Sequence, residues 1–300
     1  MTSAMLESEA LDLFRSLSNV GRWGAADELG TLNLITTEKR LQAVHSIETG
    51  RVTPLGRILR PKHDEGGLFG DGGVTMTARW DETAAQDRLV IEAHGFEVTH
   101  LDALGHSFHA DRAWNDRHIA DVVGPSGLRF GAVIGSANGI LTRGVLLDVA
   151  GSRGVDRLET DDGVSAADLD RAEAFGSVHV EPGDAIFVRT GRDYHTGNGT
   201  GPLDVRAGVL PDVLPWLRGR DVALYSGDCV ERMPSGYPGL PMPLHQVGMV
   251  AMGLWILDNP DIEALALACA AERRSVFALV VAPLRLPGGT ASAVNPLALF

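Results

Sequence analysis

Five short, almost uninterrupted apolar runs constrain the fold of this chain more than any other feature of its sequence. Apolar runs of this length, bounded by turn-forming residues, are typical of β-strands that are covered on both faces. They lie at residues 88–93, 144–149, 185–189, 222–226 and 276–281. We therefore predict a buried sheet as the core of the chain.

Helical patterns alternate with these runs along the sequence. Residues 165–172 begin with a serine cap and carry acidic residues early, and residues 209–217 and 243–257 show two further helical patterns. The first 45 residues combine helical spacing with turns. We expect an α/β protein with one domain at residues 46–300, built on a mixed, barrel-like sheet flanked by helices, and an N-terminal helical arm at residues 1–45.

The charge and the cysteine content exclude several classes of protein. The formal net charge is −13, which opposes binding to nucleic acid or to an anionic membrane surface. The two cysteines, Cys229 and Cys269, lack the spacing of a disulfide framework or a cysteine-rich zinc site. Residues 1–9 do not resemble a secretory signal, and no apolar run reaches about 18 residues. We expect a cytoplasmic protein.

A cluster of histidines marks the candidate site. Four of the ten histidines fall within residues 94–109. If residues 99–102 are extended, His100 and Asp102 point to the same side of a strand, and a turn at Gly105 lets His106 fold back toward them. One imidazole and one carboxylate on one face begin a divalent-metal site that suits zinc or manganese. The alternative is a set of ordinary polar residues at a sheet end, but three convergent groups favour a site.

More distant residues are candidates to complete such a site. His245 opens an apolar helical stretch, and Asp258 lies at its far end. Taken alone, a histidine on an apolar face is more often a satisfied core residue. Asp258, beside Asn259 and Pro260, is on its own more typical of a cap or a turn.

Two other enzyme classes lack their signatures. The chain has no GxSxG elbow of a serine hydrolase, since Ser126 and Ser235 lie in Pro-Ser-Gly turns. It also has no convincing glycine-rich phosphate loop.

Several ordered motifs resemble those of a known family. They are THLDALGH at residues 99–106, WG with DELGTLNLIT at residues 23–36, RGVLLDV at 143–149, PGDAIFVRTG at 182–191 and APLRLPGGT at 282–290. Together they resemble the longer-chain branch of the cyclase-like metal-dependent hydrolases, the family of bacterial kynurenine formamidase and isatin hydrolase. The resemblance runs from Arg22 almost to the C-terminus, and it implies a swivelling β/β/α fold.

The resemblance also implies roles for individual residues. The metal ligands would be His100, Asp102, His245 and Asp258, where Asp258 stands at a position that is commonly glutamate in the family. His106 would act as general acid/base or orient water, with metal ligation as a second role. Shorter members have a further histidine four residues before the one matched by His100; here that residue is Phe96. His94 is the candidate replacement, and we expect one zinc or manganese ion per chain, not two.

The expected activity is hydrolysis of an amide, formamide, lactam or lactone bond in a small cyclic or aromatic substrate by metal-activated water. A polyketide-type cyclase or dehydratase using the same site is the first alternative. A non-catalytic, metal-poor binding protein of the same fold is the second, because Phe96 removes one ligand. The candidate pocket residues are Trp23, Asn33, Phe96 and Glu231, and the resemblance implies a homodimer or homotetramer.

Overall fold

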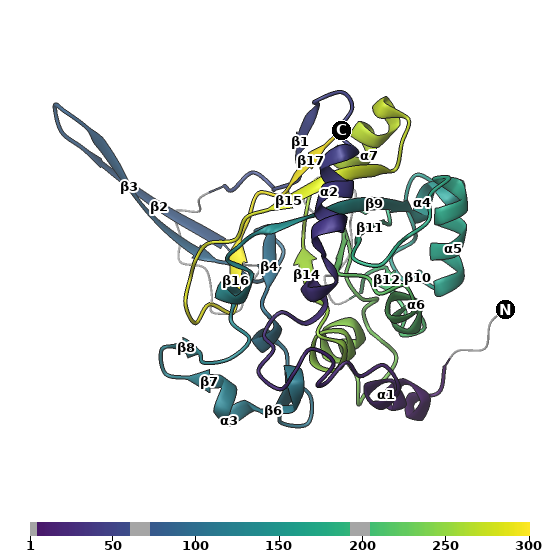
Figure 1. Ribbon diagram of the computed structural model, residues 1–300. Coiled ribbons are helices and arrows are strands. Elements are labelled where there is room, and N and C mark those ends of the chain that lie inside the picture. Colours follow the sequence, from purple (N-terminus) through teal and green to yellow (C-terminus); the bar gives the residue numbers. More distant parts are fainter. Residues whose placement is uncertain (1–4, 61–72, 193–204) are drawn as a thin grey trace.

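The structure, a computed structural model, describes residues 5–60, 73–192 and 205–300. Its centre is a curled sheet of nine strands (Figure 1). In spatial order these are β1 (Val52–Pro54), β17 (Leu297–Leu299), β15 (Val276–Val281), β9 (Ile140–Asp148), β11 (Ala185–Arg189), β13 (Leu224–Gly227), β14 (Trp255–Asp258), β4 (His100–Asp102) and β16 (Ala291–Ala293). Strands β9, β11, β13 and β14 run parallel, and the strands on either side of this block pair antiparallel. The predicted mixed sheet is confirmed.

Helices cover the sheet. Those of four or more residues are α1 (Glu7–Ser16), η1 (Gly30–Leu34), α2 (Thr37–His45), α3 (Ile119–Val122), η4 (Val133–Ser136), α4 (Val149–Ser152), α5 (Ala166–Phe175), α6 (Val213–Gly219), η5 (Leu244–Met252) and α7 (Ile262–Glu272). Helix α5 starts at the predicted serine cap, Ser165, whose side chain accepts a hydrogen bond from the Asp168 amide.

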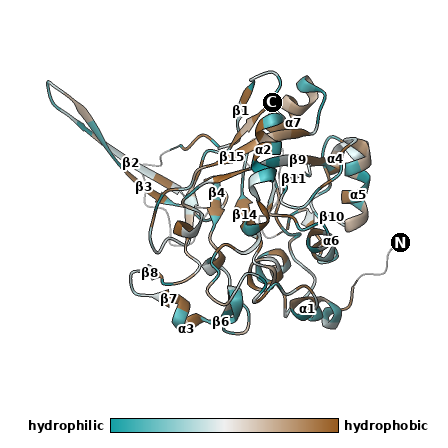
Figure 2. Cartoon of the chain, viewed as in Figure 1, coloured by the Kyte–Doolittle hydropathy of each residue, from teal (hydrophilic) through white to brown (hydrophobic). Residues whose placement is uncertain are grey.

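Each face of the sheet carries its own hydrophobic core. Neighbouring residues of one strand alternate between the two cores: Ile186 and Val188 pack on the side of α1, α5, α6 and η5, and Ala185 and Phe187 pack on the side of α7. Strands β9 and β15 are hydrophobic along most of their length (Figure 2). These strands are therefore buried on both faces, as their apolar runs predicted.

Small two-stranded ribbons decorate this core: β5 (Arg112–Ala113) with β6 (Arg117–His118), β7 (Val123–Gly124) with β8 (Gly127–Leu128), and β10 (Gly163–Val164) with β12 (Gly208–Val209). A larger ribbon, β2 (Gly73–Trp80) with β3 (Ala85–Glu92), extends away from the body (Figure 1). The prediction of a buried strand at 88–93 was wrong in this respect, because β3 pairs with β2 alone and is exposed along most of its length. Its three consecutive apolar residues, 89–91, are flanked by the charged Arg88 and Glu92, which suits an exposed ribbon.

Two helix boundaries also differ from the prediction. The helix expected at 243–257 ends at Met252, because Gly253 adopts a left-handed conformation with φ 66°, and the chain then enters β14. Asp258 consequently ends a strand, not a helix. The pattern at 209–217 starts as the short strand β12, and its helix begins only at Val213.

The N-terminal segment packs on the same cores as the rest of the chain. Ala10 and Leu13 of α1 join the core that includes η5, and the Thr36 side chain caps α2 by accepting a hydrogen bond from the Lys39 amide. The division into an arm at 1–45 and a domain at 46–300 stays a prediction. Within the described residues, no helix has the length and apolar character needed to cross a membrane.

Candidate metal centre

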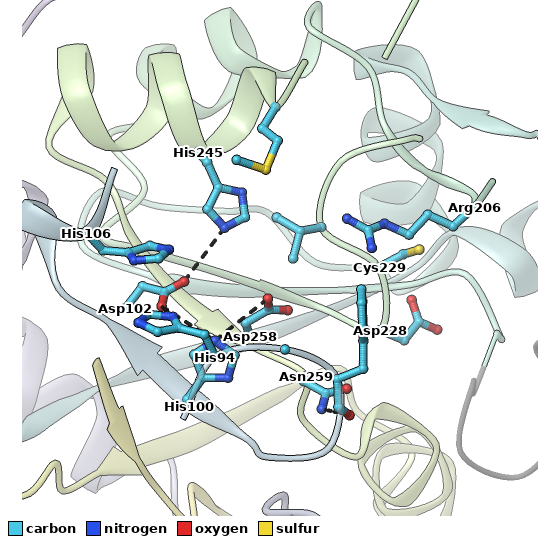
Figure 3. A pocket seen from close by; sticks show the side chains of 14 residues that line it. His94, His100, Asp102, His106, Arg206, Asp228, Cys229, His245, Asp258 and Asn259 are labelled. Atoms are coloured by element: carbon cyan, nitrogen blue, oxygen red, sulfur yellow. Dashed lines mark hydrogen bonds and ion pairs between the residues drawn. The ribbon is translucent and has the colours of Figure 1, made fainter. Parts of the chain in front are cut away.

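Four histidines converge on one aspartate of β4, the last strand but one of the sheet (Figure 3). His100 and Asp102 lie on the same face of β4 and are 2% and 1% exposed. His106 ends the short helix η2 (Leu104–His106), His94 follows β3, and His245 comes from η5. The ligand atoms of His94, His100 and Asp102 lie within 4.8 Å of one another, and so do those of Asp102, His106 and His245. Asp102 is common to both groups.

Three of these imidazoles are anchored through one ring nitrogen. His100 Nδ1 donates to the Val98 carbonyl oxygen at 2.8 Å, and His245 Nδ1 donates to the Glu231 carboxylate at 2.9 and 3.1 Å. The Nε2 atom of His94 lies 3.0 Å from the Thr290 hydroxyl. Such contacts fix the orientation of a ring and leave its other nitrogen for a metal.

The remaining nitrogen of each anchored ring faces Asp102. The distances from its oxygens are 3.1 Å to His94 Nδ1, 3.5 Å to His100 Nε2 and 3.7 Å to His245 Nε2. A ring that is anchored on one side and directed at a shared carboxylate on the other is the arrangement of a histidine metal ligand.

Asp102 supplies the test of whether a cation fits. Both of its carboxylate oxygens are buried, and neither makes a hydrogen bond of acceptable geometry within the described residues. Burial opposes its charge, yet the surrounding histidines hold the pKa of Asp102 well below its usual range, so the carboxylate is ionised. A buried carboxylate ringed by imidazole nitrogens is a donor set that zinc or manganese accepts. The residues present therefore fit a divalent metal.

Two further acids belong to this cluster. Asp258 pairs in register with His100, and its Oδ2 lies 4.0 Å from His100 Nε2. Burial raises the pKa of Asp258. Against the effect of burial, the Glu231 and Asp102 carboxylates raise the pKa of His245 well above its usual value. The excess of carboxylates thus attracts positive charge to the place where the imidazoles meet.

His106 occupies a separate position in the cluster, beside the ring of His94. Its ring stacks on that of His94 with the centroids 4.0 Å apart and the planes 13° apart. Burial, reinforced by the neighbouring imidazoles, lowers the pKa of His106 to about 4. A neutral imidazole at physiological pH can accept a proton, and its ring nitrogen also lies within reach of the second ligand group.

The cluster forms one side of a cavity of about 160 Å³, a volume similar to that of cavities that hold a single benzene ring. Its described walls consist of His94, Gly95, Phe96, His100, Asp102, His106, Arg206, Asp228, Cys229, Val230, Met242, His245, Asp258 and Asn259. The five residues proposed from the sequence as ligands or catalytic base, together with His94, are therefore brought together in one place.

Of the four pocket residues proposed from the sequence, two lie at or next to the cavity and two lie away from its described walls. Phe96 lines the cavity, and Glu231 lies behind His245. Trp23 and Asn33 are not among the described lining residues: Trp23 packs against Trp114, and Asn33 donates to Asp27 Oδ1 at 2.7 Å. Their turn folds onto the neighbouring core, and their place in a substrate pocket stays a prediction.

Sequence reasoning missed Arg206, Asp228 and Met242 as lining residues. A usable signal existed for Asp228, which directly follows β13 just as Asp258 ends β14. These strands are parallel, and ligands bind at the carboxyl ends of parallel strands. No comparable local signal marks Arg206 or Met242.

Comparisons with known proteins agree with this architecture. A family model described as "Putative cyclase" matches residues 52–231, which include His100, Asp102 and His106. A crystal structure described as a novel cyclase is 25% identical in sequence and gives a TM-score of 0.84, covering 96% of this chain and 99% of its own.

Two isatin hydrolases share the fold at lower identity. Isatin hydrolase A from Ralstonia solanacearum is 19% identical with a TM-score of 0.60, covering 88% of this chain and 97% of its own. Isatin hydrolase A from Labrenzia aggregata, bound to benzyl benzoate, is 18% identical with a TM-score of 0.61, covering 83% and 93%. No curated protein sequence matches the chain.

Proposed function

The chain belongs to the putative cyclase family, and on that premise we propose that it is a metal-dependent hydrolase. Its proposed substrates are small cyclic or aromatic molecules with an amide, formamide, lactam or lactone bond. The observation that carries the proposal is the set of three anchored imidazoles directed at the buried, ionised Asp102. The cavity volume, which suits one aromatic ring, supports a substrate of this size.

The metal would be held by His94, His100, Asp102 and His245, with Asp258 beside them. A divalent metal bound there would polarise the scissile carbonyl and lower the pKa of water toward neutrality. We propose one zinc or manganese ion per chain, because both candidate ligand groups share Asp102. His94 would act as the metal ligand in place of the histidine that shorter family members have at the position of Phe96. This supports a complete set of ligands.

The chain's own residues supply the proton transfers and the positioning. His106, neutral near pH 7, takes a proton from the attacking water and passes it to the leaving nitrogen or oxygen. Glu231 accepts a hydrogen bond from His245 Nδ1 and thereby directs Nε2 into the cavity. A cyclase or dehydratase would use the same groups; the hydrolase is preferred because solved structures that share this fold are described as isatin hydrolases.

The first test is metal content. Elemental analysis of the purified protein should give about one zinc or manganese per chain, and His100→Ala should lose it. His109→Ala is the matched control, because His109 belongs to the same segment but stacks on Phe14, 3.9 Å away, outside the cluster. A wild-type protein that takes up no metal after supplementation would contradict the proposal and favour a metal-free binding protein.

We also propose that the chain forms a homo-oligomer through the β2–β3 ribbon. A two-stranded ribbon is marginally stable alone in water, and this one leaves Trp80 78% and Leu89 50% exposed. Such apolar exposure on a protruding element suits contact with a second copy.

Trp80→Ser with Leu89→Ser should weaken self-association by about 2 kcal/mol or more, roughly 30-fold in Kd, since buried aromatics dominate interfaces. Sedimentation velocity measures the change. Leu267→Ser is the control, because Leu267 is 71% exposed but lies on α7. Equal effects of the ribbon variant and the control, or no effect, would refute the proposed interface.

A further inference from the structure

Arg206 is the only arginine or lysine among the described residues that line the cavity. Two backbone hydrogen bonds of 2.9 Å to Met233 hold the backbone of Arg206 in place. Its guanidinium points into the cavity (Figure 3). The Nε atom is buried and has no hydrogen-bond partner within the described part of the chain. A buried donor without a partner in a cavity wall calls for a ligand that accepts from it.

The Phe96 ring stacks against the face of this guanidinium. The Cζ atom of Arg206 lies 4.9 Å from the centroid of the Phe96 ring, within the range of a cation–π contact. The Phe96 backbone oxygen in turn accepts a hydrogen bond from the Asn259 side chain. Stacking uses the face of the guanidinium plane and leaves its N–H edge for another partner.

The three aspartates that line the cavity have partners other than Arg206. Asp228 accepts hydrogen bonds of 2.8–3.0 Å from Thr190 and Gly191, and Asp102 faces the imidazoles. The Oδ2 atom of Asp258 lies 4.0 Å from His100 Nε2, and the charge of His100 lowers the pKa of Asp258 more than that of Arg206 does. Within the described residues, Arg206 forms no ion pair with any of the three.

We propose that the substrate carries a carboxylate and that Arg206, stacked on Phe96, binds it at the wall beside the metal ligands. The planar edge of an arginine matches the two oxygens of a carboxylate in a bidentate, charge-assisted contact. The carboxylate site rests on the proposed hydrolase function for the reaction, and it narrows the proposed substrates to anionic aromatic or cyclic molecules. The phenylalanine that replaces a histidine of the family thus positions the specificity residue.

The probes are benzoate and its neutral isostere benzamide, with azide as an anion that lacks the paired oxygens. Their affinities are measured by calorimetry on zinc-loaded and on chelator-treated protein. Wild type should bind benzoate more tightly than benzamide. Arg206→Gln should weaken benzoate about 10- to 100-fold, the usual cost of a lost charge-assisted pair, and leave azide almost unchanged. Arg206→Lys, which keeps the charge without the planar fork, should fall between the two.

Several outcomes would overturn the inference: equal binding of benzoate and benzamide, no benzoate binding, or equal weakening of benzoate and azide in Arg206→Gln. Phe96→Leu should also weaken benzoate, and an unchanged affinity would remove Phe96 from the site.

A turnover assay separates this inference from the proposed function. Hydrolysis of formanilide and of its 2-carboxylate derivative with equal efficiency, unaffected by Arg206→Gln, would keep the hydrolase and reject the carboxylate site. Arg206-dependent benzoate binding without metal uptake or hydrolysis would keep the carboxylate site and reject the hydrolase.

Discussion

Asp102→Asn is expected to abolish both metal binding and hydrolysis while the protein stays folded. The asparagine has nearly the same shape but loses the charge that three anchored imidazoles face at 3.1–3.7 Å. Outer-shell partners of metal ligands usually contribute 10- to 100-fold in affinity, so the loss of a shared ligand should exceed about 100-fold. This carboxylate belongs to both candidate ligand groups, so the described cluster offers no second way to assemble either of them.

Zinc-dependent stability measures this loss directly. Zinc at about 1,000 times its Kd should stabilise wild type by about 4 kcal/mol, because it binds the folded chain, and should leave the variant unchanged. Asp228→Asn is the matched control: Asp228 lies in the same cavity, but its oxygens accept hydrogen bonds from Thr190 and Gly191. A variant at Asp102 that retains one metal per chain would show that the metal binds elsewhere.

The local part of this site could be predicted from the sequence because strand geometry fixes it. His100 and Asp102 are two residues apart on an extended strand, so they share a face, and the turn at Gly105 returns His106 to the same place. His245 and Asp258 were candidates from the sequence alone, but only the family resemblance favoured them as metal ligands. Nothing in their own surroundings distinguishes a metal ligand from a buried core histidine or a turn aspartate.

The parts that could not be predicted depend on long-range pairing. Arg206 reaches the cavity because its backbone pairs with Met233, and Glu231 reaches His245 across 14 residues. Periodicity also fails at 243–257, where an apolar run suits a buried helix and a buried strand equally well. The helix gives way to the strand at Gly253, where the chain packs closely against Trp114: a Cβ at this position would lie 2.8 Å from the indole ring.

A second large effect is expected far from the cavity, at Asp184→Ala. Asp184 is fully buried at the start of β11, where it accepts from Arg143 Nε and Nη2 at 2.9 and 2.6 Å and pairs with Lys39 Nζ at 2.5 Å. Arg143 belongs to β9 and Lys39 to α2, so this carboxylate joins helix α2 to the central sheet. Its removal leaves two largely buried cations with the half-exposed Glu181 carboxylate as their remaining acidic partner among the described residues.

Breaking a buried pair from one side typically costs 3–5 kcal/mol, so urea unfolding should show a loss of about that size. Asp184→Asn should retain part of the stability, because its amide oxygen still accepts from Arg143. Glu159→Ala is the control, since the Glu159 carboxylate is 86% exposed and its contact with Arg192 is long, at 3.8 Å, so its loss should change stability little. Zinc stoichiometry of the folded fraction should be unchanged, because Asp184 contributes to stability and not to the cavity. A loss below about 1 kcal/mol would mean that Glu181, which also pairs with Lys39 and Arg143, is sufficient to balance both cations.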